Sequence, residues 1–429
     1  MFKYKTVNEW LSYINSSSPA EINLSLERVY DIGNKLNLLN PNSKIITVAG
    51  TNGKGSCVSI LESIYLLSGY SVGSFMTPFL FSYNEQFRVN GKYIEDYKLC
   101  DAFLKINNAC DLNTQLTVFE YGTLAAFIIF KESNLDIWLL EVGLGGRFDA
   151  VNAIDSDLAV ISSISIDHIN WLGNTRDKIG YEKAGVFRKN KLSVCGDFDP
   201  PKSLTKYAFD IKTHLFCQNR EFGYIDNITS WSWWSGDVKL EYLPKSGLNL
   251  QNISTCLMAI NLLQLCLPVD KKIILKSLSD LKLTARIQVV YSDVIKIFDV
   301  AHNPASVSLL SDYLSKNIIS GKTIAIFSIL SDKDVLSIIN IIKNNINKWY
   351  ISELNNSRFM PIKKIQQSFK NANIKNVICC DSVKNAYNQA LSLTKKGDRV
   401  VVFGSFKTVS EAVCKADDTF NALACSSTE

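Results

Sequence analysis

A glycine-rich segment between a strand-like run and a helix-like run constrains the fold of this chain more than any other feature. Residues 45–48 are β-branched and predict a strand, and residues 57–67 have the apolar spacing of a helix. The segment between them contains Gly50, Thr51, Asn52, Gly53, Lys54, Gly55 and Ser56. Such glycines let backbone N–H groups converge on an anion, the helix N-terminus adds positive potential, and the lysine can reach terminal phosphates. The sequence therefore predicts a strand, a phosphate-binding loop and a helix.

The spacing of this loop differs from the usual G-x-x-x-x-G-K-[ST] pattern. Gly50 lies only three residues before Gly53, and Gly55 separates Lys54 from Ser56. The variant is more informative than the common loop, because it is typical of one superfamily.

Composition excludes several classes of protein. With 429 residues, the chain is long enough for two to three domains, each with its own core. Its 46 basic and 41 acidic residues are dispersed, so the net charge of +5 favours anionic substrates and not a nucleic acid. No apolar run approaches the roughly 18 to 20 residues of a membrane span. The eleven cysteines include no C-x-x-C pair, and no signal peptide precedes the polar start, so we expect reduced thiols in the cytoplasm.

Strand and helix patterns alternate along the chain and predict an α/β protein. Residues 45–49, 71–76, 137–142 and 158–164 are strand candidates of the first part. Residues 191–247 predict shorter, irregular strands, in which Trp231, Trp233 and Trp234 are expected to pack and not to bind a ligand.

The alternation restarts near residue 295 as a second unit. Its strand candidates are residues 295–300, 323–328, 349–352, 377–380 and 399–403, with helices over 304–314 and 335–347. Five strands with four crossovers predict a Rossmann-like sheet, and residues 285–292 predict the hinge before it. The expected fold is a phosphate-loop domain with a central, mostly parallel sheet over residues 1–288, followed by a smaller Rossmann-like domain over residues 289–429.

Polar groups fall at strand ends, where open α/β sheets bind ligands. Glu141 ends an apolar strand before Gly143, Leu144, Gly145 and Gly146, so its carboxylate can face a nucleotide-bound Mg²⁺. A dinucleotide-binding G-x-G-x-x-G, or a simple turn, is the weaker alternative because the third glycine is missing. His168, beside Asp167, follows another strand and is a candidate metal ligand, with a structural histidine as the alternative.

Many motifs occur in a fixed order along nearly the whole chain. They are residues 22–29, the loop 50–56, Thr77-Pro78-Phe79, Tyr83-Asn84-Glu85, residues 88–91, residues 119–124, residues 141–149, Asp167-His168, residues 182–185, residues 299–304 and residues 404–409. In this order the chain resembles the bifunctional dihydrofolate synthase and folylpolyglutamate synthase type of the Mur ligase superfamily.

The resemblance implies an ATP-dependent carboxylate–amine ligase. A carboxylate of dihydropteroate, or the γ-carboxylate of a reduced folate, would attack ATP to give an acyl phosphate, which L-glutamate opens to an amide. Residues 1–288 would be the ATP-binding domain of the Mur ligase central type, and residues 289–429 the glutamate ligase domain. A ligase with only one of the two activities, a ligase for a cell-wall precursor and a non-catalytic nucleotide-binding protein are the alternatives.

The resemblance also assigns the site residues. Lys54, His168 and Lys183 would be catalytic, with Lys183 carbamylated; its alternative is an unmodified lysine paired with Glu182 or another acid. Thr77 and Glu141 would hold one Mg²⁺ and His168 a second, and K⁺ is a further candidate ion. The nucleotide would contact residues 50–56 together with Asn252, Arg286, Asp299 and His302. The pterin substrate would lie near Ala20, Glu21, Thr117, Phe148, Asp149 and Ala150. The family resemblance further implies a monomer that binds neither nucleic acid nor membranes.

Overall fold

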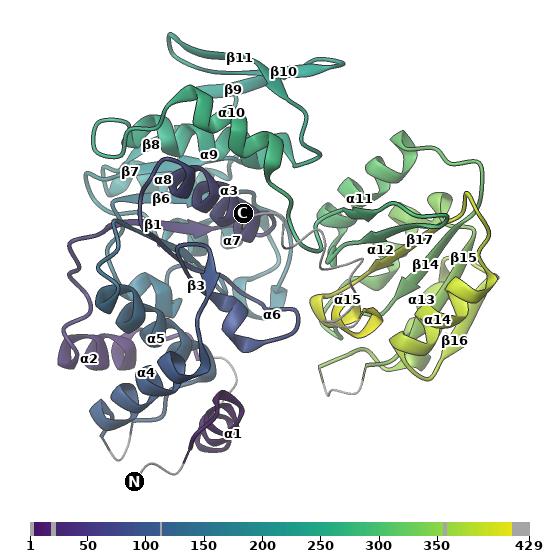
Figure 1. Cartoon of the computed structure of the whole chain (residues 1–429), viewed down its shortest axis with the longest axis horizontal. Coiled ribbons are helices and arrows are strands. Elements are labelled where there is room, and N and C mark those ends of the chain that lie inside the picture. Colours follow the sequence, from purple (N-terminus) through teal and green to yellow (C-terminus); the bar gives the residue numbers. More distant parts are fainter. Residues whose placement is uncertain (1–3, 19–22, 112–113, 355–357, 414–429) are drawn as a thin grey trace. The chain divides into compact units, whose positions relative to one another are not determined.

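The computed structural model describes residues 4–18, 23–111, 114–354 and 358–413. The chain divides into two units, Met1–Leu281 and Lys282–Glu429 (Figure 1). Among the described residues, no helix combines the length and the apolar character that a bilayer crossing requires. None of the nine cysteines in these ranges forms a disulfide.

An eight-stranded sheet forms the centre of the N-terminal unit, in the order β4-β3-β2-β5-β1-β6-β7-β8. Its strands are β1 (Lys44–Ala49), β2 (Val72–Phe75), β3 (Phe87–Val89), β4 (Lys92–Tyr93), β5 (Ile137–Glu141), β6 (Leu158–Ile161), β7 (Leu192–Cys195) and β8 (His214–Cys217). All neighbouring pairs from β2 to β8 are parallel, and β3 and β4 are added antiparallel at one edge. The four strand candidates of this part are therefore confirmed. The predicted strand over residues 158–164 ends early, at Ile161, because the next residues turn to contact the phosphate loop.

Both faces of this sheet are covered, which explains why its strands are apolar at consecutive positions. Ile45 and Trp138 belong to the core on one face, and Ile46 and Leu139 to the core on the other. The first face carries α1 (Val7–Ser17), α2 (Glu27–Lys35), α4 (Asp96–Ala109), α5 (Val118–Glu132), α7 (Arg176–Ala184) and α8 (Lys202–Asp210). The second face carries α3 (Lys54–Leu67), α9 (Leu250–Leu263) and α10 (Lys271–Asp280) (Figure 1).

A separate three-stranded antiparallel sheet accounts for the tryptophan-rich segment. It consists of β9 (Phe222–Asp226), β10 (Ser230–Ser235) and β11 (Val238–Pro244). Trp231 and Trp233 are buried in the second core, and their indole N–H groups donate to the Pro244 and Ser254 carbonyl oxygens at 3.0 and 3.1 Å. The prediction that these two tryptophans serve packing is confirmed.

The C-terminal unit is built on a six-stranded sheet in the order β12-β13-β17-β14-β15-β16. Its strands are β12 (Gln288–Val290), β13 (Ile295–Phe298), β14 (Thr323–Phe327), β15 (Lys348–Ser352), β16 (Val377–Cys380) and β17 (Arg399–Phe403). Its helices are α11 (Pro304–Lys316), α12 (Val335–Ile342), α13 (Ile362–Asn371), α14 (Val383–Leu393) and α15 (Phe406–Ala412). All five predicted strands are present, but the sequence analysis missed β12, a three-residue antiparallel edge strand too short to show periodicity.

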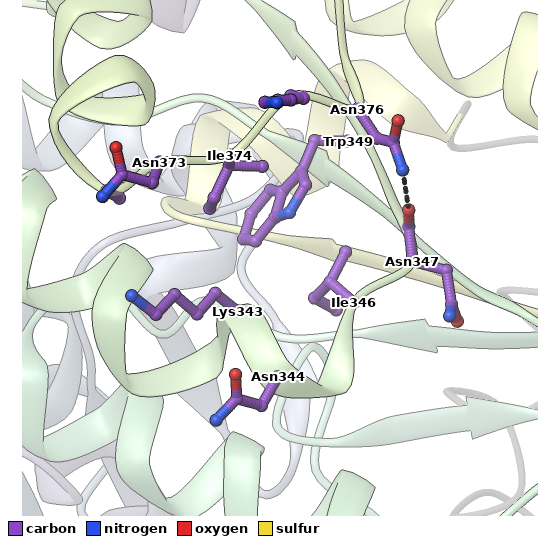
Figure 2. A pocket seen from close by; sticks show the side chains of 10 residues that line it. Lys343, Asn344, Ile346, Asn347, Trp349, Asn373, Ile374 and Asn376 are labelled. Carbon is purple, nitrogen blue, oxygen red and sulfur yellow. Dashed lines mark hydrogen bonds between the residues drawn. The ribbon is translucent and has the colours of Figure 1, made fainter.

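A pocket of about 420 Å³ opens at the amino ends of β15 and β16 in this unit. Four asparagines and Lys343 surround the Trp349 indole there, and Asn376 donates to the Asn347 carbonyl oxygen at 3.3 Å (Figure 2). Parallel α/β sheets bind their ligands at the opposite, carboxyl edge. The active site is therefore expected at the carboxyl ends of the strands and not in this pocket.

Candidate active site

The predicted phosphate loop joins the carboxyl end of β1 to the first turn of α3. Gly50 and Gly53 have positive φ values of 144° and 86°, which residues with a side chain rarely adopt. A Cβ atom would also collide with the Ser162 hydroxyl at Gly50 and with the Asn252 side chain at Gly53. Both glycines are therefore required by backbone conformation and by the close approach of distant segments.

Lys54 is the first residue of α3, and its side chain folds back over the loop. Its Nζ atom lies 3.2 Å from the Gly50 carbonyl oxygen and 3.4 Å from the Thr51 carbonyl oxygen. The ammonium group is thus held above the loop by weak contacts with neutral acceptors. A phosphate placed on the loop would offer it a stronger, charged partner.

Asn252 comes to the loop from the first turn of α9. Its backbone N–H donates to the Asn249 side chain, which caps this helix, at 3.2 Å. Its own side chain is buried against Gly53. The structure thus brings together two predicted nucleotide-binding segments that are far apart in sequence.

Glu141 and Thr77 meet beside the loop. Glu141 is the last residue of β5, and its carboxylate accepts the Thr77 backbone N–H at 3.0 Å. A Cβ atom at Gly55 would lie 3.3 Å from the same carboxylate oxygen, so the acid lies against the start of α3. Carboxylate and hydroxyl oxygens are the hard ligands that Mg²⁺ prefers. Thr77 and Glu141 therefore fit the Mg²⁺ ion that is expected between them.

Lys183 approaches the loop from the last turn of α7. Its side chain is buried, and Nζ donates to the Gly50 carbonyl oxygen at 2.8 Å. Loss of solvent lowers the pKa of Lys183 to about 7, and the Lys54 charge acts in the same direction, against the attraction of Asp167 and Asp149. Within the described part of the chain it forms no ion pair, so the alternative of a lysine paired with Glu182 or another acid is not observed.

The turn after β5 is closed on itself by Asp149. Its two carboxylate oxygens accept the backbone N–H groups of Val151 at 3.0 Å and Leu144 at 2.8 Å. Burial raises the pKa of Asp149 to about 7, while these hydrogen bonds and Lys54 oppose the rise. Phe148, in contrast, leaves 45% of its surface exposed and can contact a ligand.

The other predicted substrate residues are less accessible. Ala150 is buried beside Asp149, and Thr117 is a buried N-cap of α5 whose hydroxyl accepts the Glu120 N–H at 3.2 Å. Ala20 and Glu21 lie outside the described residues.

His168 lies at the same edge of the sheet as Thr77 and Glu141. It follows β6, adopts a left-handed conformation with φ of 50°, and precedes the short helix α6 (Ile169–Leu172). The Asp167 carboxylate accepts its backbone N–H at 2.8 Å. The predicted metal ligands thus end β5 or follow β2 and β6, whose carboxyl ends share one edge.

The remaining predicted residues lie at one end of the antiparallel pair β12 and β13 in the C-terminal unit. The Asp299 carboxylate accepts the N–H groups of Ile287 at 2.7 Å and Ala301 at 2.6 Å, and burial raises its pKa, with Arg286 opposing. The Arg286 guanidinium lies 5.0 Å from the Phe406 ring centroid. The His302 ring is 2.8 Å from the Val300 carbonyl oxygen. Arg286 therefore comes from the segment before β12, and Asp299 and His302 come from the segment after β13.

One group of residues at this edge was not predicted from the sequence. Ser162, Ser163 and Ser165 contact the phosphate loop through hydrogen bonds. Small polar residues just after an apolar strand were the available signal, but the strand was predicted to continue through residue 164.

The chain is similar to known proteins over most of its length. Residues 285–406 match the family described as Mur ligase, glutamate ligase domain. The dihydrofolate synthase/folylpolyglutamate synthase of Buchnera aphidicola subsp. Acyrthosiphon pisum (strain APS) is 38% identical over 409 residues, which cover 95% of this chain and 98% of that protein. The structure of Escherichia coli FolC in complex with DHPP and ADP has a TM-score of 0.90 at 35% identity, covering 95% of this chain and 96% of that one.

A further solved structure extends the comparison. It is a bifunctional folylpolyglutamate synthase/dihydrofolate synthase with Mn, AMPPNP and L-glutamate bound, with a TM-score of 0.88 at 36% identity over 95% of this chain and 97% of that one. Sequence identity and fold therefore agree over almost the full length of both partners in each comparison. The chain belongs to the dihydrofolate synthase/folylpolyglutamate synthase family.

Proposed function

We propose that this protein catalyses both reactions of its family at the carboxyl edge of the large sheet. It is an ATP-dependent carboxylate–amine ligase that joins L-glutamate to dihydropteroate, forming dihydrofolate, and to reduced folates. The relatives reported above are named for folate activities, which favours this function over a cell-wall precursor ligase.

One observation carries the assignment of the site. Two lysines, Lys54 and Lys183, both place their Nζ atoms within 3.2 Å of the Gly50 carbonyl oxygen, and the Glu141 carboxylate lies at the start of the same helix. The Lys54 cation and an acid beside a glycine loop match the needs of phosphoryl transfer, which depends on neutralising and aligning charge.

The chemistry can be written with these residues in named roles. A substrate carboxylate attacks the γ-phosphate of ATP, ADP leaves, and an acyl phosphate forms. The glutamate amine then attacks the acyl carbon, the amide bond forms, and phosphate leaves. Lys54 and the N–H groups of residues 50–56 hold the phosphates and neutralise the charge that develops on the transferred group. Thr77 and Glu141 would hold one Mg²⁺ and His168 a second, which would supply further positive charge at the phosphates.

Lys183 is the residue that we propose to be carbamylated. Carbamate formation requires a neutral amine, and the fall of its pKa to about 7 supplies one near neutral pH. The modification would convert this buried amine into an anion able to support the second metal ion.

The two units would share the binding of substrates. Asn252 would contact the nucleotide from the N-terminal unit, and Arg286, Asp299 and His302 from the C-terminal unit, whose residues 285–406 match the glutamate ligase domain family. We propose 1–288 and 289–429 as the functional domains, with Arg286 in the boundary segment at the end of the first. The pterin would bind near Ala20, Glu21, Thr117, Phe148, Asp149 and Ala150. We further propose a cytoplasmic monomer that uses K⁺ in addition to Mg²⁺.

ATP-dependent incorporation of labelled glutamate, run separately with dihydropteroate and with reduced folates, tests this function. We expect incorporation with both acceptors and a stoichiometric release of ADP. Incorporation with only one acceptor would leave a monofunctional ligase, and none with either would refute the proposal. Lys54→Ala is the matched negative control.

A further inference from the structure

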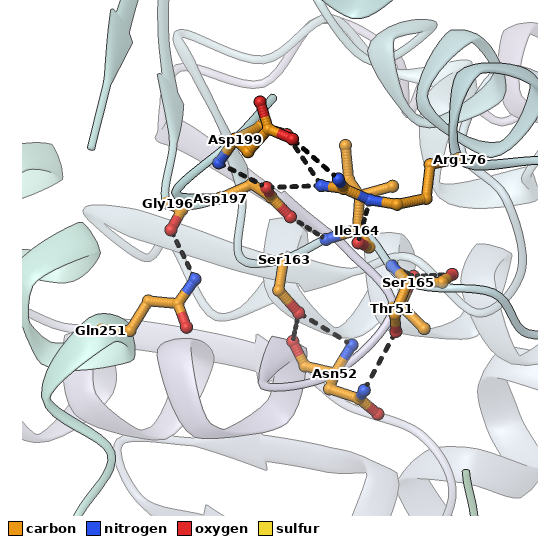
Figure 3. Close-up of polar contacts among 10 residues, drawn as sticks. All are labelled: Thr51, Asn52, Ser163, Ile164, Ser165, Arg176, Gly196, Asp197, Asp199 and Gln251. Carbon is orange, nitrogen blue, oxygen red and sulfur yellow. Dashed lines mark hydrogen bonds and ion pairs between the residues drawn. The ribbon is translucent and has the colours of Figure 1, made fainter. Parts of the chain in front are cut away.

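Residues 163–165 contact the phosphate loop in an alternating pattern. The Ser163 carbonyl oxygen accepts the Thr51 N–H at 2.7 Å, and the Ser163 hydroxyl lies 3.1 Å from the Asn52 carbonyl oxygen. The Ser165 N–H and carbonyl oxygen both lie 3.1 Å from the Thr51 hydroxyl (Figure 3). The position of Thr51 and Asn52 is thus set by Ser163 and Ser165.

Ile164, between these serines, directs its backbone polar groups to an ion pair. Its N–H donates to the Asp197 carboxylate at 2.7 Å, and its carbonyl oxygen accepts from Arg176 Nε at 3.1 Å. A second Arg176 nitrogen lies 2.7 Å from the other Asp197 oxygen, so Ile164, Asp197 and Arg176 each contact the other two (Figure 3). The Asp197 side chain is only 9% exposed, so its carboxylate is largely shielded from water, whereas the Arg176 side chain is 38% exposed.

The ion pair is itself held in place. Arg176 also binds the Asp199 carbonyl oxygen at 2.7 Å, and the Asp199 N–H donates to Asp197 at 3.0 Å. Next to Asp197, the Gly196 carbonyl oxygen accepts from the Gln251 side chain at 2.6 Å (Figure 3). The pair therefore connects the segment after β7 with the start of α7, and the neighbouring Gly196 connects this segment with the start of α9.

Each connected element carries a residue of the proposed site. Arg176 begins α7, which ends near Lys183, and Gln251 precedes Asn252 on α9. The segment from Ile164 continues to His168. None of the contacts of Arg176 or Asp197 described above reaches the phosphate loop directly, so the pair acts on it through Ser163 and Ser165.

We infer that the Arg176–Asp197 ion pair is a positioning element for nucleotide binding. It fixes residues 163–165 and, through them, the Thr51 and Asn52 groups that face the phosphates. This inference rests on the proposed function, because it takes residues 50–56 as the nucleotide site. Loss of the pair should weaken nucleotide binding and leave the affinity for glutamate unchanged.

Asp197→Asn tests the inference, because it removes the charge and keeps the shape. Asp157→Asn is the matched control: Asp157 accepts the Ile45 N–H at 3.0 Å and lies 3.4 Å from Lys44 and 3.3 Å from Lys191, at the opposite edge of the same strands. Each variant loses one partly buried carboxylate at an end of strands β1, β6 and β7. Only Asp197→Asn should affect the phosphate loop.

The readouts do not depend on turnover alone. Calorimetry with ADP and Mg²⁺ should give a Kd about tenfold higher for Asp197→Asn, as expected for the loss of a charge-assisted contact, and an unchanged Kd for Asp157→Asn. Hydrogen exchange of the ligand-free protein should be faster at Thr51, Ile164 and Ser165 only in Asp197→Asn. Steady-state assays should show a raised KM for ATP with the KM for glutamate unchanged.

Equal Kd values and equal exchange in the two variants would overturn the inference. If Asp197→Asn does not fold, Arg176→Lys provides the test, since it keeps the charge but loses the Nε donor to Ile164. This variant should also raise the Kd for ADP. An unchanged Kd would refute the positioning role of the ion pair. Failure of the wild-type protein to bind ADP would instead refute the proposed function.

Discussion

Replacing Lys183 with methionine should stabilise the N-terminal unit, and the gain should shrink as the pH rises. Methionine keeps the length of the side chain and removes an amine that is buried and forms no ion pair among the described residues. In the wild type the pKa of Lys183 falls from 10.5 in water to about 7 in the folded protein. Between these values the unfolded chain holds a proton that the folded chain does not, so wild-type stability rises with pH in this window.

The magnitude follows from the size of this fall. At about 1.4 kcal/mol for each pH unit, the full window corresponds to about 5 kcal/mol. Asp149, whose pKa is raised to about 7, titrates at the lower end of the window, so the cleaner range is pH 8.0 to 9.5. Over that range the advantage of Lys183→Met over the wild type should fall by about 2 kcal/mol.

Urea unfolding followed by tryptophan fluorescence provides the assay. Trp349 is the only one of the seven tryptophans outside the N-terminal unit, so the signal reports mainly on the unit that contains Lys183. Buffers must be free of CO₂, because a carbamate would replace the amine. Lys178→Met removes an exposed lysine from the same helix and is the control. The difference in unfolding free energy between Lys183→Met and the wild type should fall as the pH rises. If it does not fall, or falls no more than the difference for the control, the reasoning is refuted.

Three further predictions concern catalysis. Lys54→Ala should lower turnover with either acceptor by about 10² to 10³-fold, while the circular dichroism spectrum stays unchanged. Near wild-type turnover would refute the phosphate-loop assignment. Glu141→Gln should raise the Mg²⁺ concentration needed for half-maximal activity, whereas an unchanged titration would place the metal elsewhere. Lys183→Ala should be inactive and partly rescued by short carboxylates, and Lys183→Arg should not be rescued, because its fixed cation has the wrong charge; full activity of Lys183→Ala without additive would count against the carbamate.

Much of the fold could be predicted because its strands are buried on both faces. The runs of residues 45–49 and 399–403 are apolar at nearly every position, and each is a central strand of its sheet. β12 could not be predicted in the same way, since three residues carry no measurable period. Its neighbours Ala285 and Ile287 have positive φ values, which only the folded context explains.

The phosphate loop could be predicted because its residues are contiguous, whereas their supports could not. Gly50 and Lys54 follow a strand in a recognisable order. Arg176 and Asp197 are separated in sequence and are joined only by the parallel order of β6 and β7. Local patterns contain no information about such a pairing, because it depends on the order of strands in the finished sheet.

The contacts of Gly53 with Asn252 also determine when the site can form during synthesis. Residues 50–56 emerge early, but the side chain that packs on Gly53 belongs to α9, close to the end of the N-terminal unit. Contacts between such distant positions form late, after most of the loop-closure entropy has been lost. A nascent chain that ends before Leu250 therefore lacks the Asn252 side chain that packs on the phosphate loop. Nucleotide binding should accordingly report that the whole N-terminal unit has folded, and a bound nucleotide should protect this unit from proteolysis.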